Sequence, residues 1–376
     1  MALPYSLLDL KNNIAPPRIL CNDLIAEILP WLPVKSLVRF MCASKSLRSL
    51  IKSLISNPSL VKLQLERSRS HVNANLLCEM RDSLVHHIPL FRSSMENPSS
   101  SATLVVHPSH EHRIIGSCNG LICYAISSPS REKYVFYLWN PVTGLTAKHS
   151  PPLLLHYHFV STFGFGYDRL SDTYKVVVPI YSDHCINSSF LVRVKVCNMG
   201  DARWRNIQLP ITCLHLITPY GLYLRGTLSW LTFHPSRENQ YLGISLDLTN
   251  ETFTHFMLPP YHDVVGPMLE NLGTFNDSLS FSYNSMTHFV AWQMKELGYQ
   301  NSWTQLFRIE TNYLNINSPM LRLTPNGGIL IMSKYGKYAL LYNQRDNQQE
   351  YVKISADIRH IFDMDYTPTL VSPCSS

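Results

Sequence analysis

The sequence predicts an α+β chain in two parts, a small helical unit near the N-terminus and a larger all-β domain after it. Between residues 20 and 56, apolar residues recur every three or four positions, which is the spacing of amphipathic helices. From residue 112 onward, short apolar runs alternate with turns rich in Gly, Asn, Asp and Pro, which is typical of strands. The chain has 376 residues, which is enough for two or three domains.

Three short helices are expected in the first part. Asn22-Asp23 can cap a first helix, which the prolines Pro30 and Pro33 end. A second helix follows, and Ser44 can cap a third that Asn57-Pro58 ends. A unit of about 40 residues is marginally stable alone. Its apolar surface must therefore be covered by the rest of the chain or by another protein.

The second part repeats with a period close to 50 residues. A turn followed by a strand recurs, and its marker residues are 53, 54, 51 and 50 positions apart: Leu121, Tyr174, Leu228, Leu279 and Ile329. A second pattern, consisting of a strand, a polar turn and a returning strand, follows each marker. About four strands in such a period are typical of a kelch-like propeller blade. Five such units are present.

A closed ring must hide its edge strands. Strand-like segments at 75–80 and 83–90 precede the repeats, and a further one at 365–372 follows them. We expect these segments to pair as a composite sixth blade, which gives a propeller-like domain of five to six blades. Two stacked sheets are the alternative. The polar stretch 93–101 is expected to be a loop rather than a linker between domains.

Composition argues for a globular protein of a reducing compartment. Apolar residues make up 45% of the chain and charged residues 15%, and no run of about 18 apolar residues suggests a membrane span. The first residues lack the features of a signal peptide. The nine cysteines are scattered and form no Cys-x-x-Cys pair, which favours free thiols over disulfides or a zinc site. A cytoplasmic or nuclear location is expected.

The positive charge is concentrated at the front of the chain. Residues 1–70 contain ten Lys and Arg against four Asp and Glu, whereas the other 306 residues contain 22 of each. A basic docking unit suits an acidic protein partner. Nucleic acid is the weaker interpretation, because the basic residues are interleaved with apolar positions and form no cluster.

Two parts of the sequence resemble known families. Residues 20–55, above all LPVKSLVRF at 32–40, resemble the F-box that docks onto a Skp-family adaptor in cullin–RING ubiquitin ligases. Several later motifs resemble the plant F-box-associated domain: GSCNGL at 116–121, LWNP at 138–141, FGFGYD at 163–168, DTYKVV at 172–177, SWTQLF at 302–307 and LVSP at 370–373.

The resemblance implies a domain order and a set of adaptor contacts. We expect a flexible N-terminus over residues 1–17, an F-box over 18–66 and the β domain over 67–376. The residues that the resemblance assigns to the adaptor face are Leu20, Ile28, Leu29, Leu32, Pro33, Val34, Leu37, Phe40 and Ile51. Some of them must instead pack between the helices, and the sequence does not separate the two groups.

No motif for catalysis, cofactor binding or metal binding is found. The histidines His107, His110 and His112 have no fourth ligand at a usual spacing. Asp168 and Asp172 bracket a turn and are expected to cap its amides rather than to catalyse. His156 and His158 are expected to be exposed. Five tryptophans in or beside the repeats are expected to pack in the core: Trp139, Trp204, Trp230, Trp292 and Trp303.

The expected function is therefore recognition rather than chemistry. The resemblance implies the substrate-recognition subunit of a Skp–cullin–F-box ubiquitin ligase, with no catalytic residue, cofactor or metal of its own, and with an unidentified target protein. Similar chains include pollen S-locus F-box proteins, which recognise secreted ribonucleases. A non-ligase interaction scaffold is a further alternative, since Cys21 and Leu47 depart from the residues usual in the family. A propeller hydrolase or lectin would need converging acids or a metal ion at one face.

Overall fold

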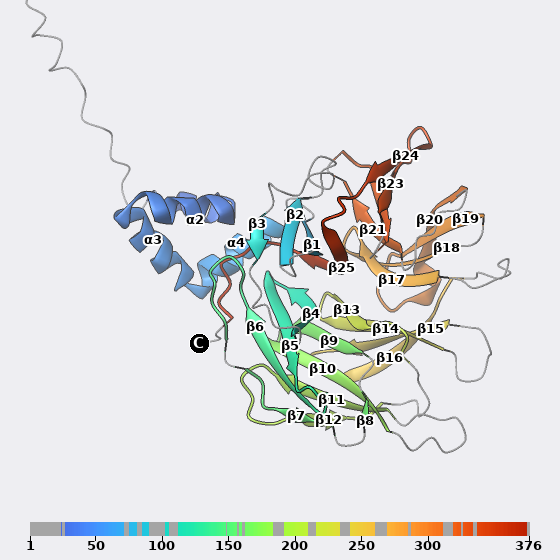
Figure 1. Cartoon of the computed structure of the whole chain (residues 1–376), viewed down its shortest axis with the longest axis horizontal. Coiled ribbons are helices and arrows are strands. Elements are labelled where there is room, and N and C mark those ends of the chain that lie inside the picture. The colour runs from blue at the N-terminus through green and yellow to red at the C-terminus, as the bar shows by residue number, and fades with distance from the viewer. Residues whose placement is uncertain are drawn as a thin grey trace, which may run out of the picture.

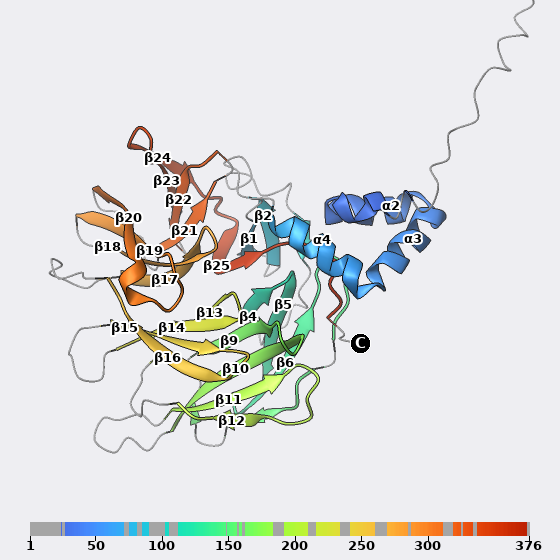
Figure 2. The ribbon, with the colours of Figure 1, turned by 180° about the vertical axis from the view of Figure 1, so that it is seen from behind.

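Helices form one side of the molecule and β-sheets form the rest (Figure 1). The computed structural model describes residues 24, 27–70, 75–80, 85–89, 102–104, 112–147, 149–155, 158–159, 162–182, 192–209, 216–233, 241–259, 269–284, 287–310, 319–324, 326–333 and 337–373. Seen from behind, the same helices lie beside a ring of sheets, and the last described residues of the chain lie next to them (Figure 2).

The helical unit consists of short elements separated by proline and polar residues. It contains the 3-10 turn η2 (Leu29–Trp31) and the helices α2 (Val34–Ala43), α3 (Lys45–Ile55) and α4 (Pro58–Ser70). Pro30 lies in η2, and Pro33 directly precedes α2. The Arg48 amide donates to the Ser44 carbonyl oxygen at 3.0 Å, so α3 begins directly after α2.

Helix α4 was not expected from the sequence. The Asn57 Oδ1 atom accepts hydrogen bonds from the amides of Ser59 (3.1 Å) and Leu60 (3.4 Å), so Asn57 caps the start of α4. Pro58 takes the first helical position, where its missing N–H is not needed. Asn57-Pro58 therefore ends one helix and begins another. The expected boundary between residues 66 and 67 falls inside α4.

The described strands make six blades of four strands each, numbered here in ring order. Blade 1 pairs β25 (Ile358–Tyr366) with β1 (Asn75–Met80), β2 (Val85–Pro89) and β3 (Ala102–Leu104). Blade 2 contains β4 (His112–Cys118), β5 (Leu121–Ser127), β6 (Lys133–Trp139) and β7 (Leu153–Leu154). Blade 3 contains β9 (Phe163–Asp168), β10 (Thr173–Ser182), β11 (Val192–Asn198) and β12 (Arg205–Ile207), with β8 (His158–Phe159) beside β10.

The other blades follow the same order. Blade 4 contains β13 (Tyr220–Leu224), β14 (Thr227–Phe233), β15 (Tyr241–Asp247) and β16 (Thr252–Met257). Blade 5 contains β17 (Leu269–Phe275), β18 (Ser278–Asn284), β19 (His288–Met294) and β20 (Trp303–Glu310), with the 3-10 turn η4 (Gln300–Ser302) before β20. Blade 6 contains β21 (Pro319–Leu323), β22 (Ile329–Ser333), β23 (Tyr338–Asn343) and β24 (Gln348–Lys353). Strands β9 and β13 also pair in parallel, which joins blades 3 and 4 into one sheet.

The repeat predicted from the sequence corresponds to the blades. Each marker residue is the first or second residue of the second strand of its blade and is buried. The turn before that strand takes positive φ at both residues in blades 2, 4 and 5: Asn119-Gly120, Arg225-Gly226 and Asn276-Asp277. Two-residue turns of this kind match the twist of antiparallel strands. The propeller interpretation is confirmed, and that of two stacked sheets is wrong.

Six apolar clusters lie between neighbouring blades and close the ring. They join blades 1 and 2, 2 and 3, 3 and 4, 4 and 5, 5 and 6, and finally 6 and 1. The last of these brings Leu76 of β1 and Ile361 of β25 against Met320 and Leu330 of blade 6. The β domain therefore has its own continuous core, which does not depend on the helices.

The composite blade forms as expected, but from a different C-terminal segment. The strand that pairs with β1 is β25, at residues 358–366, whereas the sequence suggested 365–372. The polar residues Asp363 and Asp365 made β25 difficult to recognise as a strand from the sequence. Their partner Arg322 belongs to another blade and becomes apparent only in the folded ring. Residues 367–373 instead leave the sheet and run beside the helices (Figure 2).

Candidate functional site

The predicted adaptor contacts fall into two groups, of which the first is buried. Leu29, Val34, Leu37 and Ile51 are at most 3% exposed and pack together in the core of the helical unit. Val61 of α4 completes this core from the helix that the sequence missed. These side chains form the interior of the helical unit and have no surface left for a partner.

The second group lies on the surface. Ile28 is 46% exposed and Phe40 is 39% exposed, although both are large apolar residues. Pro33 is also exposed, whereas Leu32 is partly buried against the helical core. Leu20 lies outside the described residues.

Two further exposed apolar residues belong to the same region and were not assigned from the sequence. Leu24 is 50% exposed and Trp31 is 67% exposed. The Arg67 guanidinium of α4 lies 3.3 Å from the centre of the Trp31 ring, which orients the indole. Large exposed apolar residues gathered on one small unit indicate an interaction surface. We call Leu24, Ile28, Trp31 and Phe40 the apolar docking residues.

The helical unit also exposes several basic side chains. Those exposed on α2, α3 and α4 are Arg39, Lys45, Arg48, Lys52 and Lys62. Lys62 Nζ lies 2.9 Å from Asp172 Oδ2 in the turn between β9 and β10, so one basic residue ties α4 to the ring. An exposed pair of this kind contributes little stability. The other basic residues are consistent with an acidic partner.

The chain after β25 joins the helical unit to blade 2. Asn140 is fully buried, and its Nδ2 donates to the carbonyl oxygens of Thr369 (3.0 Å) and Val371 (2.7 Å). Its Oδ1 accepts from the amides of Val142 (2.8 Å) and Thr143 (3.3 Å). The LWNP motif therefore holds the C-terminal segment against the blade.

The CNGL motif contacts the same segment. Thr369 Oγ1 donates to the Asn119 carbonyl oxygen at 2.8 Å. Gly120 has φ of +75°, and a Cβ atom there would lie 2.4 Å from the Thr367 carbonyl oxygen, so only glycine fits this turn. Both family-like motifs of blade 2 thus have structural roles at the joint between the two parts.

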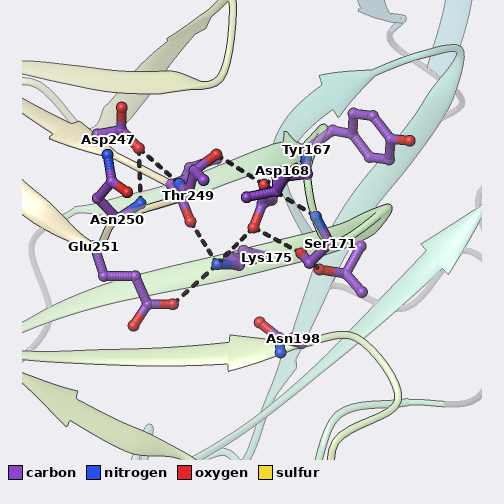
Figure 3. A network of polar contacts seen from close by, with 12 residues as sticks. Tyr167, Asp168, Ser171, Lys175, Asn198, Asp247, Thr249, Asn250 and Glu251 are labelled. Atoms are coloured by element: carbon purple, nitrogen blue, oxygen red, sulfur yellow. Dashed lines mark hydrogen bonds and ion pairs between the residues drawn. The ribbon is translucent and has the colours of Figure 1, made fainter.

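The motifs of blade 3 build a charged network between blades 3 and 4 (Figure 3). Lys175 Nζ lies 3.0 Å from Asp168 Oδ2 and 3.0 Å from Glu251 Oε1, and it also donates to the Leu248 carbonyl oxygen. Thr249 Oγ1 donates to Asp168 Oδ1 at 2.8 Å. This lysine is buried and is paired with groups from both blades.

Hydrogen bonds decide the charge of Asp168. Burial alone raises the pKa of this carboxyl group, but hydrogen bonds from Ser171, Lys175 and Thr249 outweigh burial and hold the pKa well below its usual range. Asp168 Oδ1 also accepts from the Leu170 amide at 3.0 Å, so it caps its turn as expected. A carboxylate fixed in this way is a structural group rather than a general acid.

A buried guanidinium ties the closing strand β25 to its neighbours. Arg322 of β21 is 4% exposed, with one terminal nitrogen 3.2 Å from Asp363 Oδ1 and its Nε 3.4 Å from Asp365 Oδ1. Asn271 donates to Asp363 and Thr274 donates to Asp365, both at 3.0 Å. Strands β17, β21 and β25 are thereby linked around the axis of the ring.

A cavity of about 740 Å³ lies along the axis of the ring. It is lined by the C-terminal ends of the innermost strands, and Leu65 of α4 lies at its edge. Several charged residues in its wall are paired with each other, such as Arg225 with Asp277 at 2.6 Å. The cavity is the axial channel that a closed propeller leaves.

The described residues form no metal-binding cluster, and two of their thiols are deeply buried. No group of three or more His, Cys, Asp or Glu residues among the described residues is arranged to hold a metal ion. Cys78 and Cys197 are free and buried, and burial raises the pKa of each thiol to about 12. His107, His110 and His156 lie outside the described residues, and only the backbone of His158 is described.

The tryptophans pack as expected. Trp230 is 1% exposed and Trp139 is 8% exposed. The others are partly buried against the clusters between blades: Trp204, Trp292 and Trp303.

No helix among the described residues has both the length and the apolar character needed to cross a membrane.

Comparisons with known proteins agree with this division of the chain. Residues 19–58 match the family described as F-box domain, and residues 71–374 match the family described as F-box associated beta propeller domain. An F-box/kelch-repeat protein of Arabidopsis thaliana is 27% identical over 97% of this chain and 99% of its own length. The F-box protein CPR1 of Arabidopsis thaliana is 26% identical over 77% of this chain and 72% of its own length.

Solved structures give more distant likenesses. The nidogen/laminin complex includes a chain with a TM-score of 0.43 and 12% identity, covering 77% of this chain and 96% of that one. The Dos1 propeller has a TM-score of 0.40 and 8% identity, covering 76% of this chain and 71% of that one.

Proposed function

Because this chain belongs to the family in which an F-box domain precedes an F-box associated beta propeller domain, we propose that it is the substrate-recognition subunit of a Skp–cullin–F-box ubiquitin ligase. In this role the F-box binds a Skp-type adaptor, and the propeller binds the protein that is to be modified. The proposal includes a location in the cytoplasm or the nucleus.

One observation carries the adaptor half of the proposal. The apolar docking residues remain exposed although the buried F-box side chains pack in a core together with Leu370, and the propeller has closed its ring with its own clusters. Nothing else in the described part of the chain covers Ile28 and Phe40. A partner protein is therefore the natural cover for these residues.

The proposed contribution to ubiquitin transfer is proximity. The chemistry takes place on partner subunits, and this chain holds the target beside them. Such tethering raises the effective concentration of target lysines near the conjugating enzyme. The buried, paired state of Asp168, Lys175 and Arg322 supports a non-catalytic role, because these groups are occupied in stabilising the ring.

The target is proposed to bind the face of the ring opposite the F-box. Helix α4 and the C-terminal segment contact the turns that join first to second strands, such as the Asn119-Gly120 turn. The opposite ends of the strands carry exposed side chains that a protein can contact, among them Arg113, Phe233 and Tyr338. Binding there leaves adaptor and target on different sides of the propeller.

Two experiments test the proposal. Pull-down with an adaptor–cullin complex separates a ligase subunit, which is captured, from an interaction scaffold, which is not. Proximity labelling in plant cells should compare the full chain with Phe40→Ala. We expect labelled targets to accumulate with the variant, because they are bound but not degraded. Equal target levels with both chains would contradict a role in turnover, and a labelled secreted ribonuclease would favour recognition of the S-locus type.

A further inference from the structure

The C-terminal segment after β25 contacts both halves of the molecule. It leaves β25 at Tyr366 and runs between the F-box helices and blade 2, as both views show (Figures 1 and 2). We propose that residues 367–371 form a strap that fixes the angle between the F-box and the propeller. The F-box is then one rigid body with the ring rather than a domain on a hinge.

The first contact lies in the F-box core. Leu370 is fully buried and belongs to the same apolar cluster as Leu29, Leu37 and Ile51, although more than 300 positions separate them in the chain. Val371 is partly buried and packs against the same cluster. The F-box therefore takes one of its core side chains from the far end of the protein.

The second contact lies in blade 2. The Asn140 side-chain amide donates to the carbonyl oxygens on both sides of Leu370, those of Thr369 (3.0 Å) and Val371 (2.7 Å). Two hydrogen bonds from one buried group fix the backbone at the position where Leu370 enters the helices. If the segment left this site, the buried Asn140 amide would lose both acceptors, and a buried donor without a partner is destabilising.

The third contact lies at the root of the strap. The segment continues directly from β25, and Asp363 and Asp365 of that strand are held by Arg322. Thr369 Oγ1 also donates to the Asn119 carbonyl oxygen at 2.8 Å. The strap is therefore anchored in the ring at its start, in blade 2 at its middle and in the F-box at Leu370.

The consequence for ubiquitin transfer rests on the proposed function. A fixed angle keeps the target-binding face at a set distance and direction from the adaptor and its ligase partners. A flexible joint would spread a bound target over many positions and lower the effective concentration of its lysines at the reaction centre. The orientation itself can be measured without adaptor or target.

Asn140→Asp is the decisive variant. Aspartate keeps the acceptor oxygen for the Val142 amide, but it cannot donate to Thr369 and Val371 and places negative charge beside their carbonyl oxygens. Leu370→Ala removes the apolar contact independently. Asn343→Asp is the matched control, because Asn343 Oδ1 only accepts from the Arg345 amide in an exposed turn.

The experiment is a spin-label distance measurement on the full chain. One label is attached to Cys42, which is exposed on α2, and the other to Tyr338→Cys, which is exposed on blade 6. Cys21, Cys185, Cys213 and Cys374 are replaced by serine. We expect a single narrow distance distribution for this background and for Asn343→Asp.

Asn140→Asp and Leu370→Ala should at least double the width of that distribution under conditions in which circular dichroism shows that the ring and the helices of each variant are folded. An Asn140→Asp distribution as narrow as the control would overturn the strap. A chain that fails to bind a Skp-type adaptor would instead contradict the proposed function and leave this measurement unaffected.

Discussion

Lys175 Nζ lies 3.0 Å from Asp168 Oδ2 between blades 3 and 4, and both side chains are almost completely buried (Figure 3). Asp168 belongs to the end of β9 and Lys175 to β10, while their further partners Thr249 and Glu251 come from blade 4. The pair therefore belongs to a network that joins two blades. Its energetics give the first two predictions.

Replacing Lys175 by Met is expected to destabilise the propeller strongly. The change leaves the carboxylates of Asp168 and Glu251 without their shared cation, and breaking a buried pair from one side typically costs about 3–5 kcal/mol. Denaturant unfolding followed by tryptophan fluorescence measures the loss. Lys353→Met is the matched control, because Lys353 is exposed, and it should change the unfolding free energy by less than about 0.5 kcal/mol. Equal stability of both variants would contradict the network.

The same network predicts a loss of stability in acid. Although burial opposes it, hydrogen bonds lower the pKa of Asp168 and of Glu251 below their usual ranges in the folded protein. As the pH falls, the two carboxylates therefore bind protons in the unfolded chain before they do so in the folded protein. The stability that the network contributes is present above pH of about 4, and it declines as the pH falls through the pKa values of the folded protein. Unfolding free energies between pH 7 and pH 3 should fall for the natural chain and fall less steeply for Lys175→Met.

Glu270 predicts the opposite dependence on pH. Burial raises the pKa of this carboxyl group to about 7, since hydrogen bonds to Tyr241 and its own backbone only partly compensate. The contribution of Glu270 to the folding free energy is fully present at pH values below the pKa that this group has in the unfolded chain. This contribution is lost as the pH rises toward 7, because the folded protein must then bury a charged carboxylate. Glu270→Gln should therefore raise the Tm at pH 8 more than at pH 5. Glu310→Gln, at an exposed position, should leave the Tm unchanged at both. A Tm gain that does not depend on pH would contradict this assignment.

Substitution of buried and of exposed F-box residues should have different effects on the stability of the helices. Leu37→Ala removes a fully buried side chain and is expected to cost about 2–5 kcal/mol, seen as loss of helical circular dichroism at lower denaturant concentration. Phe40→Ala removes an exposed side chain and should leave helix stability within about 0.5 kcal/mol. Similar losses for both variants would mean that Phe40 belongs to the core.

The blades could be predicted from the sequence because their signals are local. A turn residue that tolerates positive φ, followed by an apolar strand, recurs at every marker from Leu121 to Ile329. Helix α4 was missed because Asn57-Pro58 both ends and begins a helix, and the stop alone was recognised. Strand β25 was placed too far toward the C-terminus because Asp363 and Asp365 interrupt its apolar pattern, whereas Arg322 pairs with both aspartates in the folded ring.

The candidate site was less predictable, because burial depends on distant segments. Leu37 and Phe40 show the same helical spacing, and only the packed helices show that Leu37 faces inward and Phe40 outward. Leu370 gave no sign of belonging to the F-box core, since its contacts lie at the opposite end of the chain. Asn140 and Lys175 lie in motifs that were recognised only by their resemblance to a family, and the roles of both residues depend on partners from other parts of the chain.

The affinity of the purified full chain for a purified Skp-type adaptor tests the central claim most directly. Titration calorimetry should show one adaptor bound per chain. Phe40→Ala should raise the Kd at least tenfold, or about 1.4 kcal/mol, at unchanged Tm, because it removes an exposed anchor and no core contact. The account is contradicted if the folded natural chain does not bind the adaptor, or if Phe40→Ala binds it equally tightly.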